Sequence, residues 1–193
     1  MSEPGLMAIY SFTILDLPGT RAPFEIQTGT VTLLNLDDEG LQRVILYLRS
    51  NGLVKIQIGR KEKMSRVRQC CAVFDPDRPA RGGLLGFLSG NSGGDPSGPA
   101  REFGIEIKAR GRRSAGEARL VYLMRTLALA RPCYALVNPF LNIDVIARRR
   151  IMDGLKAFAS DHAAAVLVVT TDDSVYDELK PDNHMVLTKE GSE

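Results

Sequence analysis

The first half of the chain carries short apolar runs separated by turn residues, a pattern that predicts β-strands. Pro18-Gly19 and Thr28-Gly29 divide the earliest runs, because Gly and Pro supply the backbone angles that turns require. A helix is expected at Glu39–Arg49, where apolar residues recur at helical spacing, and Asn51-Gly52 is a suitable stop for it. The expected strands of this half are Met7–Leu15, Pro23–Gln27, Thr30–Leu36, Leu53–Ile58 and Gln69–Phe74.

In the second half, helical and strand-like patterns alternate. The stretch before it, Gly82–Pro99, is rich in Gly, Ser and Pro and is expected to be a loop with one short apolar piece. The alternation predicts a mainly parallel sheet flanked by helices, which is an α/β fold. The expected helices are Ala115–Ala130, Val145–Ala159 and Ser174–Leu179, and the expected strands are Cys133–Val137, Ala164–Thr171 and Met185–Thr188.

Composition narrows this picture to one domain in a reducing compartment. The 193 residues are 44% apolar, which is enough for one core and too little for two independent domains. The formal net charge of +2 gives no overall field that would favour nucleic acid or anionic lipid. Three cysteines argue against a disulfide scaffold, and no apolar run reaches the roughly 20 residues that span a bilayer. The first residues lack a signal-peptide pattern, so we expect a cytoplasmic protein. From the near-neutral charge we expect that it binds no nucleic acid.

Four short motifs follow one another in the second half. Ser114–Glu117 opens a helix, and Asn138-Pro139 ends a buried apolar run. Leu141–Asp144 then precedes another helix, and the run Ala165–Asp172 closes the series. This order resembles the second half of an ABC ATPase nucleotide-binding domain, with its signature motif, D-E-P, D-loop and switch His. The similarity is weaker near the start, where Phe24–Val31 resembles the strand pair that leads into the family's phosphate loop.

The resemblance implies a P-loop NTPase-like ABC ATPase fold with an antiparallel β piece at its amino end. It covers residues 1–193 as a single domain. The helical subdomain is reduced and corresponds to about residues 77–113, which include the Gly/Ser/Pro-rich loop. In the family that subdomain docks onto the transporter, so its shortening argues against coupling of the usual kind.

The best-preserved motif resembles the signature sequence L-S-G-G-[QE] and consists of Ser114, Ala115, Gly116 and Glu117. The resemblance implies that these residues face a nucleotide on the partner subunit, because a helix N-terminus offers phosphate free N–H groups and a positive dipole end. Asp144 matches the D-loop Asp and is expected at the dimer interface. The same Ser-x-x-Glu pattern is also a capping box, which needs no nucleotide to explain it.

The residues that serve a subunit's own nucleotide in the family are replaced. Leu36–Arg43 corresponds to the phosphate loop G-x-x-G-x-G-K-[ST], whose backbone N–H groups and Lys hold the phosphates. Its acids Asp37, Asp38 and Glu39 are expected to repel ATP, although acids also favour a helix N-terminus. The replaced positions are Gln42 for the Lys, Arg43 for the Ser/Thr on Mg²⁺, Asp75 for the Q-loop Gln, Val137 for the metal Asp, Asn138 for the catalytic Glu and Thr171 for the switch His.

The pattern of losses favours a non-catalytic ABC ATPase-like subunit, a pseudo-ATPase with no metal or cofactor of its own. We expect it to pair as a heterodimer with an active ABC ATPase subunit that carries ATP-Mg. A transmembrane permease would hold the complex at the inner face of the membrane. The alternative is a stand-alone interaction scaffold that uses the old dimer face, and a weakly active enzyme is a third reading. A homodimer, the transported substrate and the direction of transport stay open.

The remaining clusters have simpler interpretations. The basic runs Arg60–Arg68 and Lys108–Arg113 are expected to be solvated edges or subunit contacts, since no aromatic platform accompanies them. Arg148–Arg150 is expected on the exposed face of an amphipathic helix. Cys70-Cys71 has no second Cys/His pair at metal-ligand spacing and is expected to be a strand pair with one side chain buried. His162 and His184 are expected at the surface or hydrogen-bonded.

Overall fold

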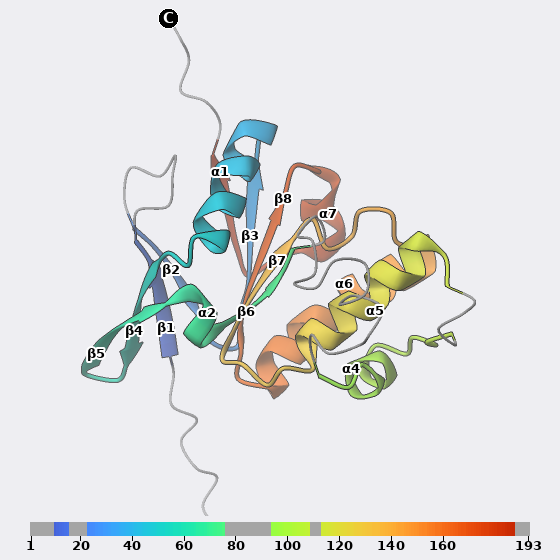
Figure 1. The fold of residues 1–193 in the computed structure, drawn as a ribbon, viewed down its shortest axis with the longest axis horizontal. Coiled ribbons are helices and arrows are strands. Elements are labelled where there is room, and N and C mark those ends of the chain that lie inside the picture. Colours follow the sequence, from blue (N-terminus) through green and yellow to red (C-terminus); the bar gives the residue numbers. More distant parts are fainter. Residues whose placement is uncertain (1–9, 16–22, 76–93, 109–112, 188–193) are drawn as a thin grey trace, which may run out of the picture.

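A computed structural model of the chain describes residues 10–15, 23–75, 94–108 and 113–187. Its centre is a five-stranded sheet, and a four-stranded sheet lies to one side of it (Figure 1). Helices cover both faces of the central sheet. Within the described ranges, no helix is long and apolar enough to cross a membrane.

The central sheet is parallel throughout, with the strand order β6-β7-β8-β3-β9. All residues of β3, β7 and β8 are buried, because these inner strands are covered on both faces. That burial explains why they read as continuous apolar runs in the sequence. The strands are β3 (Val31–Leu36), β6 (Cys71–Phe74), β7 (Cys133–Val137), β8 (Ala165–Thr170) and β9 (Asn183–Leu187).

The smaller sheet is antiparallel and has the order β2-β1-β4-β5. Its inner face contributes to the core: Phe12 pairs with Ile26 on one side and with Ile56 on the other. In β2 buried and exposed residues alternate, as expected for a sheet with one face toward solvent. The strands are β1 (Tyr10–Ile14), β2 (Phe24–Gln27), β4 (Leu53–Ile58) and β5 (Lys61–Arg66).

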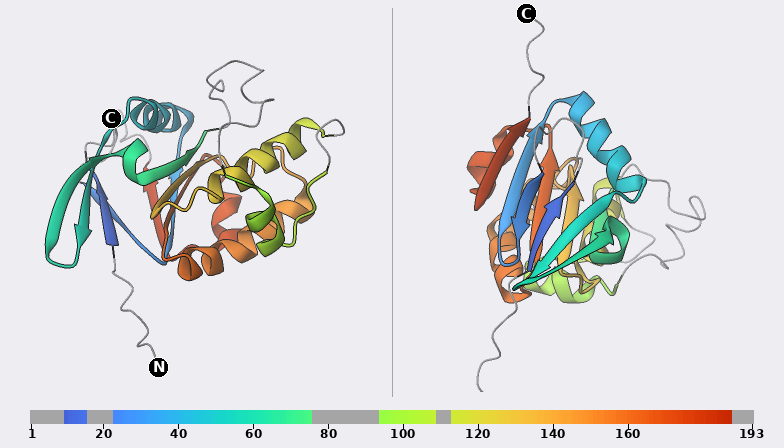
Figure 2. Two further views of the ribbon diagram at one scale, coloured as in Figure 1. Left: turned by 60° about the horizontal axis from the view of Figure 1, so that its bottom comes forward. Right: turned by 90° about the vertical axis from the view of Figure 1, so that its left-hand side faces the viewer.

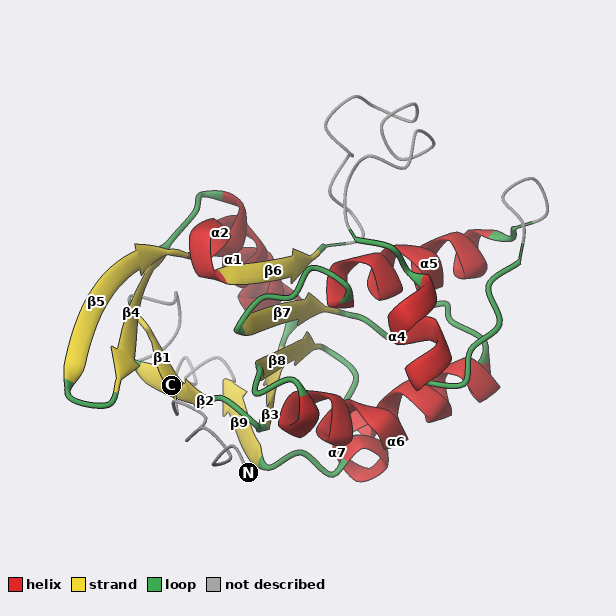
Figure 3. Cartoon of the chain, turned by 90° about the horizontal axis from the view of Figure 1, so that it is seen from below, coloured by secondary structure: helices red, strands yellow, loops and turns green. Residues whose placement is uncertain are grey.

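Two hydrophobic clusters lie on the two faces of the central sheet. Alternate residues of one strand divide between them: Leu33 belongs to one cluster and Leu34 to the other. The antiparallel sheet, α1 and α2 cover one face, and α4 to α7 cover the other (Figure 2, Figure 3). The helices are α1 (Asp38–Arg49), α2 (Val67–Cys70), α4 (Ser97–Glu102), α5 (Ala115–Leu127), α6 (Val145–Asp161) and α7 (Ser174–Leu179).

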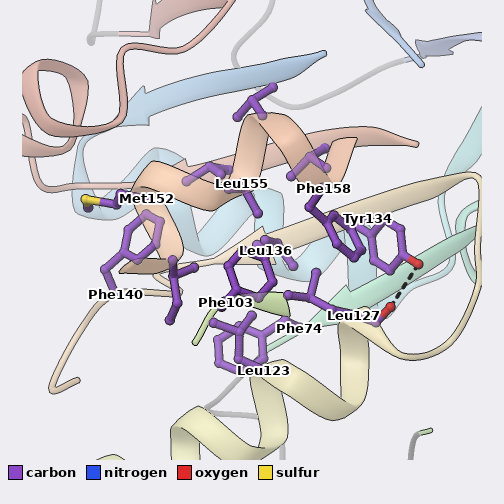
Figure 4. Packing of buried hydrophobic residues seen from close by; sticks show 14 of the residues in the cluster. Phe74, Phe103, Leu123, Leu127, Tyr134, Leu136, Phe140, Met152, Leu155 and Phe158 are labelled. Atoms are coloured by element: carbon purple, nitrogen blue, oxygen red, sulfur yellow. Dashed lines mark hydrogen bonds between the residues drawn. The ribbon is translucent and has the colours of Figure 1, made fainter. Parts of the chain in front are cut away.

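Aromatic rings link the helices to the sheet on the second face (Figure 4). Phe158 of α6 packs edge-on against Tyr134 of β7, with 5.5 Å between ring centroids. The Tyr134 hydroxyl donates a hydrogen bond to the Leu127 carbonyl at the end of α5 (3.0 Å), so its polar end is satisfied inside the core. This packing fixes α5 and α6 relative to β7, and the loops at the carboxyl ends of the strands are built on that frame.

Most predicted elements are confirmed, two expected boundaries are wrong, and one strand was not predicted. Lys61–Arg66 forms the edge strand β5, which is exposed, as expected for this basic run. An exposed edge strand needs no apolar residues, and its charges block further pairing. Gln69 lies in the short helix α2, so β6 begins only at Cys71. Ser97–Glu102 is the helix α4 although a loop was expected as far as Pro99.

Some predictions are refined or lie outside the described residues. Both Cys70 and Cys71 are buried, not one of them, and Cys70 belongs to α2. The expected start of the first strand at Met7, most of the Gly/Ser/Pro-rich loop and the last residue of the final strand, Thr188, lie outside the described ranges. His162 and His184 are exposed, as expected.

Candidate functional site

The connection between β3 and α1 is the shortest of those at the carboxyl edge of the central sheet. A single residue, Asp37, separates the end of β3 at Leu36 from the start of α1 at Asp38. Its carboxylate accepts a hydrogen bond from the Gly40 N–H (2.7 Å) and so caps the helix. A phosphate loop needs several consecutive backbone N–H groups wrapped around the anion, and a one-residue connection has no room for them.

The structure therefore changes the interpretation of the phosphate-loop positions. Gln42 and Arg43 lie within α1, so they are helix residues and not replacements at the end of a loop. Asp37, Asp38 and Glu39 are exposed, and Glu39 forms an ion pair with Arg43 one turn later. Solvent screens charges in that position, so the repulsion of ATP by these acids is weaker than expected. The missing loop is the stronger obstacle.

Asp75, at the position of the Q-loop Gln, forms an internal ion pair. It follows β6, is only 2% exposed, and accepts two hydrogen bonds from the Arg49 guanidinium, from Nε (2.7 Å) and Nη2 (3.1 Å). Because a buried carboxylate needs such a partner, Asp75 ties the end of β6 to the end of α1.

The end of β7 offers no acid for metal or water. The Val137 side chain is 1% exposed and belongs to the apolar cluster on the α1 face. Asn138 has a left-handed backbone (φ 42°), a conformation that Asn tolerates better than other residues with side chains. Its N–H donates to the Val169 carbonyl (2.7 Å), and its carbonyl accepts from Arg119 Nη2 (2.9 Å). The local backbone thus explains an Asn at this position without any catalytic role.

The start of α5 is a capping box. The Ser114 hydroxyl accepts from the Glu117 N–H (3.2 Å), and the Glu117 carboxylate accepts from the Ser114 N–H (2.7 Å). Hydrogen bonds from Lys108 first, and from the Ser114 backbone second, hold the pKa of Glu117 below its usual range. The box leaves the amides of Ala115 and Gly116 outside it, at the positive end of a 13-residue helix.

Gly116 brings α5 into direct contact with the loop after β7. A Cβ placed on this residue would lie 2.4 Å from the Asn142 carbonyl oxygen, a distance at which no side chain fits. Asn142 has a left-handed backbone of its own (φ 59°), which turns the loop toward the helix. Asp144 follows as the N-cap of α6 and accepts from the N–H groups of Ile146 (2.9 Å) and Ala147 (3.3 Å).

This contact creates a pocket of about 510 Å³ between α5, α6 and the segment before α5. Its lining combines apolar side chains with charged side chains of both signs. The structure thus brings together three of the four signature-like residues and the D-loop-like Asp, while Ala115 lies just outside. The lining residues are Ile105, Glu106, Lys108, Ser114, Gly116, Glu117, Leu120, Asn142, Ile143, Asp144, Ile146, Ala147 and Arg150.

A smaller pocket of about 190 Å³ lies on the other side of the same loop. It joins Asn138 after β7 with Thr171 after β8, the positions of the catalytic Glu and the switch His in the resemblance. Arg148 and Asp172 also line it and form an ion pair (3.3 Å). Gln42 and Asp75 line neither pocket, so the predicted residues do not form one site.

The role of Arg148 was not predicted from the sequence. It was expected on the exposed face of α6 with Arg149 and Arg150, but its side chain is only 21% exposed and reaches α7. The available signal was its place one helical turn after Asp144, which puts the two residues on the same face of α6.

Large apolar side chains are exposed along the ridge between the two pockets. Leu141 is 53% exposed, Val145 76% and Ile146 65%. Exposed apolar residues that gather at one place mark a surface for contact with another molecule.

Within the described part of the chain, no group of three or more His, Cys, Asp or Glu is arranged to hold a metal ion.

Comparison with solved structures places this arrangement in a known architecture. The chain superposes on cbiO1 from Clostridium perfringens, part of the ABC transporter complex cbiONQ, with a TM-score of 0.61 over 91% of this chain and 84% of that one. The fold is that of an ABC ATPase domain. Sequence identity in this superposition is only 19%.

Two further solved structures have the same ABC ATPase fold. A putative ABC transporter ATP-binding protein from Pyrococcus furiosus gives a TM-score of 0.58 at 15% identity, covering 92% of this chain and 97% of that one. The ATP-binding cassette MJ1267, solved in its ADP conformation, gives 0.61 at 11% identity, with 93% and 87% covered. No protein-family model matches the chain, and no curated protein sequence does.

Proposed function

We propose that this chain is a non-catalytic, ABC ATPase-like subunit of a membrane transporter complex. It pairs with an active ATPase subunit and offers Ser114–Glu117 to the ATP-Mg that the partner binds, with Asp144 at the subunit interface. A permease embedded in the membrane completes the complex, and the chain lies at the cytoplasmic face through these partners. It hydrolyses no ATP itself and holds no metal or cofactor of its own.

The connection between β3 and α1 is the observation that carries this proposal. The resemblance to ABC ATPase domains implies a phosphate loop between this strand and this helix. Here Asp37 alone connects strand and helix, and it uses its carboxylate to cap α1. The connection offers the phosphates no series of backbone N–H groups. Gln42 replaces the Lys of the phosphate loop, and Val137 replaces the Asp that would bind Mg²⁺, so ATP has no anchor on this subunit.

The other half of the nucleotide machinery supports a role toward a partner. Ser114, Gly116 and Glu117 line one open pocket together with Asp144, and the amides of Ala115 and Gly116 lie outside the capping box. The exposed ridge of Leu141, Val145 and Ile146 adds apolar surface next to that pocket. A face that combines helix-end amides outside the capping box with an apolar ridge fits a second subunit that carries a phosphate.

Three measurements test the proposal. Titration calorimetry of the isolated chain with ATP and Mg²⁺ is expected to show no binding, and pull-down from detergent-solubilised native membranes is expected to recover an ATPase subunit and a permease. Ser114→Arg should then abolish the ATPase activity of the recovered complex, because the long cationic side chain fills the pocket. ATPase activity that Ser114→Arg leaves unchanged would contradict the role in trans.

A stand-alone scaffold is the second candidate function. One observation favours it: Ser114, Glu117 and Asp144 all act as helix caps, so a partner's nucleotide is not needed to account for them. The pull-down separates the two candidates. Recovery of soluble proteins alone, without an ATPase or permease, would favour the scaffold.

A further inference from the structure

Arg148 connects the start of α6 to the segment that follows β8. Its Nη2 lies 3.3 Å from Asp172 Oδ2, 3.1 Å from Ser174 Oγ and 2.9 Å from Glu178 Oε1. Two carboxylates from different places in the chain therefore surround one guanidinium. We call Arg148 and these three partners the Arg148 clamp.

The partners of Arg148 are themselves held in place. Asp172 Oδ1 accepts hydrogen bonds from the Ser174 N–H (3.0 Å) and the Ser174 hydroxyl (2.6 Å). The Asp172 N–H donates to Thr170 Oγ1 (3.1 Å) at the end of β8. The hydrogen bond from Ser174 first, and the charge of Arg148 after it, lower the pKa of Asp172. The two hydrogen bonds from Ser174 thus orient the carboxylate that pairs with Arg148.

The loop Asn138–Asp144 lies between this clamp and α5. On the α5 side, Arg119 donates to the Asn138 carbonyl (2.9 Å), and Gly116 lies against the Asn142 carbonyl. On the other side, α6 begins directly after Asp144, and Arg148 fixes its first turn to α7. Both pockets of the site are therefore bounded by one loop that is held from two directions.

We infer that Arg148 is a positioning residue that holds the loop Asn138–Asp144 and the first turn of α6 in one arrangement by tying them to α7. The inference rests on the proposed function, because it concerns the same face that would meet a partner's nucleotide. In that setting the clamp takes the place of a nucleotide sensor: an internal ion pair, not a bound phosphate, sets the position of the interface. The subunit then presents the same surface to its partner in every nucleotide state.

A simple surface ion pair would behave differently. Exposed pairs contribute little to stability, and their loss acts weakly and on the whole molecule. A positioning contact acts locally, because the segments that it joins open independently of the core once it is removed. The location of the effect, more than its size, distinguishes the two roles.

Amide hydrogen exchange of the isolated full-length chain tests the inference. Arg148→Ala is expected to speed exchange about tenfold in peptides from residues 139–147 and 172–179, with β7, β8 and the second half of α5 unchanged. Arg149→Ala is the matched control: this neighbour is exposed and has no hydrogen-bond or ion-pair partner among the described residues. Arg148→Lys keeps the charge and is expected to restore part of the protection.

The outcomes separate this inference from the proposed function. Exchange in Arg148→Ala that equals the wild type, or that rises evenly over the whole chain, overturns the clamp. If Arg148→Ala does not fold, Glu178→Gln removes one of the two negative charges beside Arg148, at a 46% exposed position, and is judged by the same peptides. In the recovered complex, Arg148→Ala should lower the ATPase kcat by a larger factor than it lowers the amount of partner recovered. Local loosening without any recoverable ATPase partner would support the clamp and overturn the proposed function.

Discussion

Gly116 is the residue on which the geometry of the candidate site depends most. The Asn142 carbonyl occupies the space where any other residue would place its Cβ, so at this point α5 and the loop after β7 meet backbone to backbone. In the sequence, this Gly is explained equally well by a signature motif or by a helix start. Only the structure shows that it brings two separate segments together.

Gly116→Ala is expected to destabilise the protein by about 1–3 kcal/mol, because the backbone of the loop or of α5 must move away from the new methyl group. Chemical denaturation of the purified variant measures this loss. Gly98→Ala in α4 is the matched control, since nothing lies within 4 Å of its Cβ position and Ala favours a helix. Equal stability of the two variants would mean that the contact at Gly116 can accommodate a methyl group.

Asp172 makes the α6–α7 contact dependent on pH. Its pKa is lowered from about 3.8 in the folded chain by the Ser174 hydrogen bond and by Arg148. A lowered folded pKa gives stability that is present above the unfolded pKa and is lost as the pH falls through the folded one. Asp172→Asn should therefore be less stable than the wild type at pH 7, and the difference should shrink toward pH 3. A difference that stays constant in denaturation curves over this range would contradict the charged clamp.

At the scale of elements, the ends of helices decide what the carboxyl edge of the sheet can do. Asp37 follows β3 directly and caps α1, so no loop between the strand and the helix is left to surround an anion. The resemblance puts Gln42 and Arg43 at the end of a phosphate loop, but in the structure both lie inside α1. The one-residue connection that places them there is not visible in the types of the replaced residues.

Restoring the residues of a phosphate loop should not restore nucleotide binding. The double variant Gln42→Lys, Arg43→Ser places both side chains on α1, where no backbone cradle exists. Calorimetric titration with ATP and Mg²⁺ is expected to show no binding, as in the wild type. Submillimolar affinity in the double variant would mean that substitution, and not the missing loop, removed the site.

At the scale of the whole molecule, the sequence predicts the layers well. The inner strands β3, β7 and β8 were predicted because burial on both faces leaves continuous apolar runs. The helices α1, α5 and α6 were predicted because each has an apolar stripe and a capping residue at its start. The fold class followed from their alternation and is confirmed by the ABC ATPase structures.

The parts that the sequence did not predict depend on contacts between distant residues. The edge strand β5 has almost no apolar residues, so its identity comes from pairing with β4. The partners of Arg148 lie 24 to 30 residues further along the chain, beyond the reach of helical periodicity. Of the candidate site, the sequence identified the start of α5 and Asp144 but not the loop backbone that joins them.

The exposed ridge gives a prediction for the assembled complex. Val145→Asp together with Ile146→Asp should leave the melting temperature of the isolated chain within a few degrees of the wild type, because both side chains already face solvent. The same double variant should lose the partner in the pull-down. Leu46→Asp is the control, since Leu46 is 67% exposed on α1, which covers the other face of the sheet. Partner recovery that is equal for all three proteins would remove the ridge from the interface.

The capped helix starts also determine what the folded chain responds to in the cell. Asp37, Ser114 with Glu117, and Asp144 each satisfy N–H groups of the helix that they begin, so no bound anion is needed to complete the fold. By mass action, a ligand stabilises a protein only when it binds the native state. The resistance of the isolated chain to unfolding and proteolysis should therefore not change with ATP, and in the cell it should rise with the concentration of its partner protein.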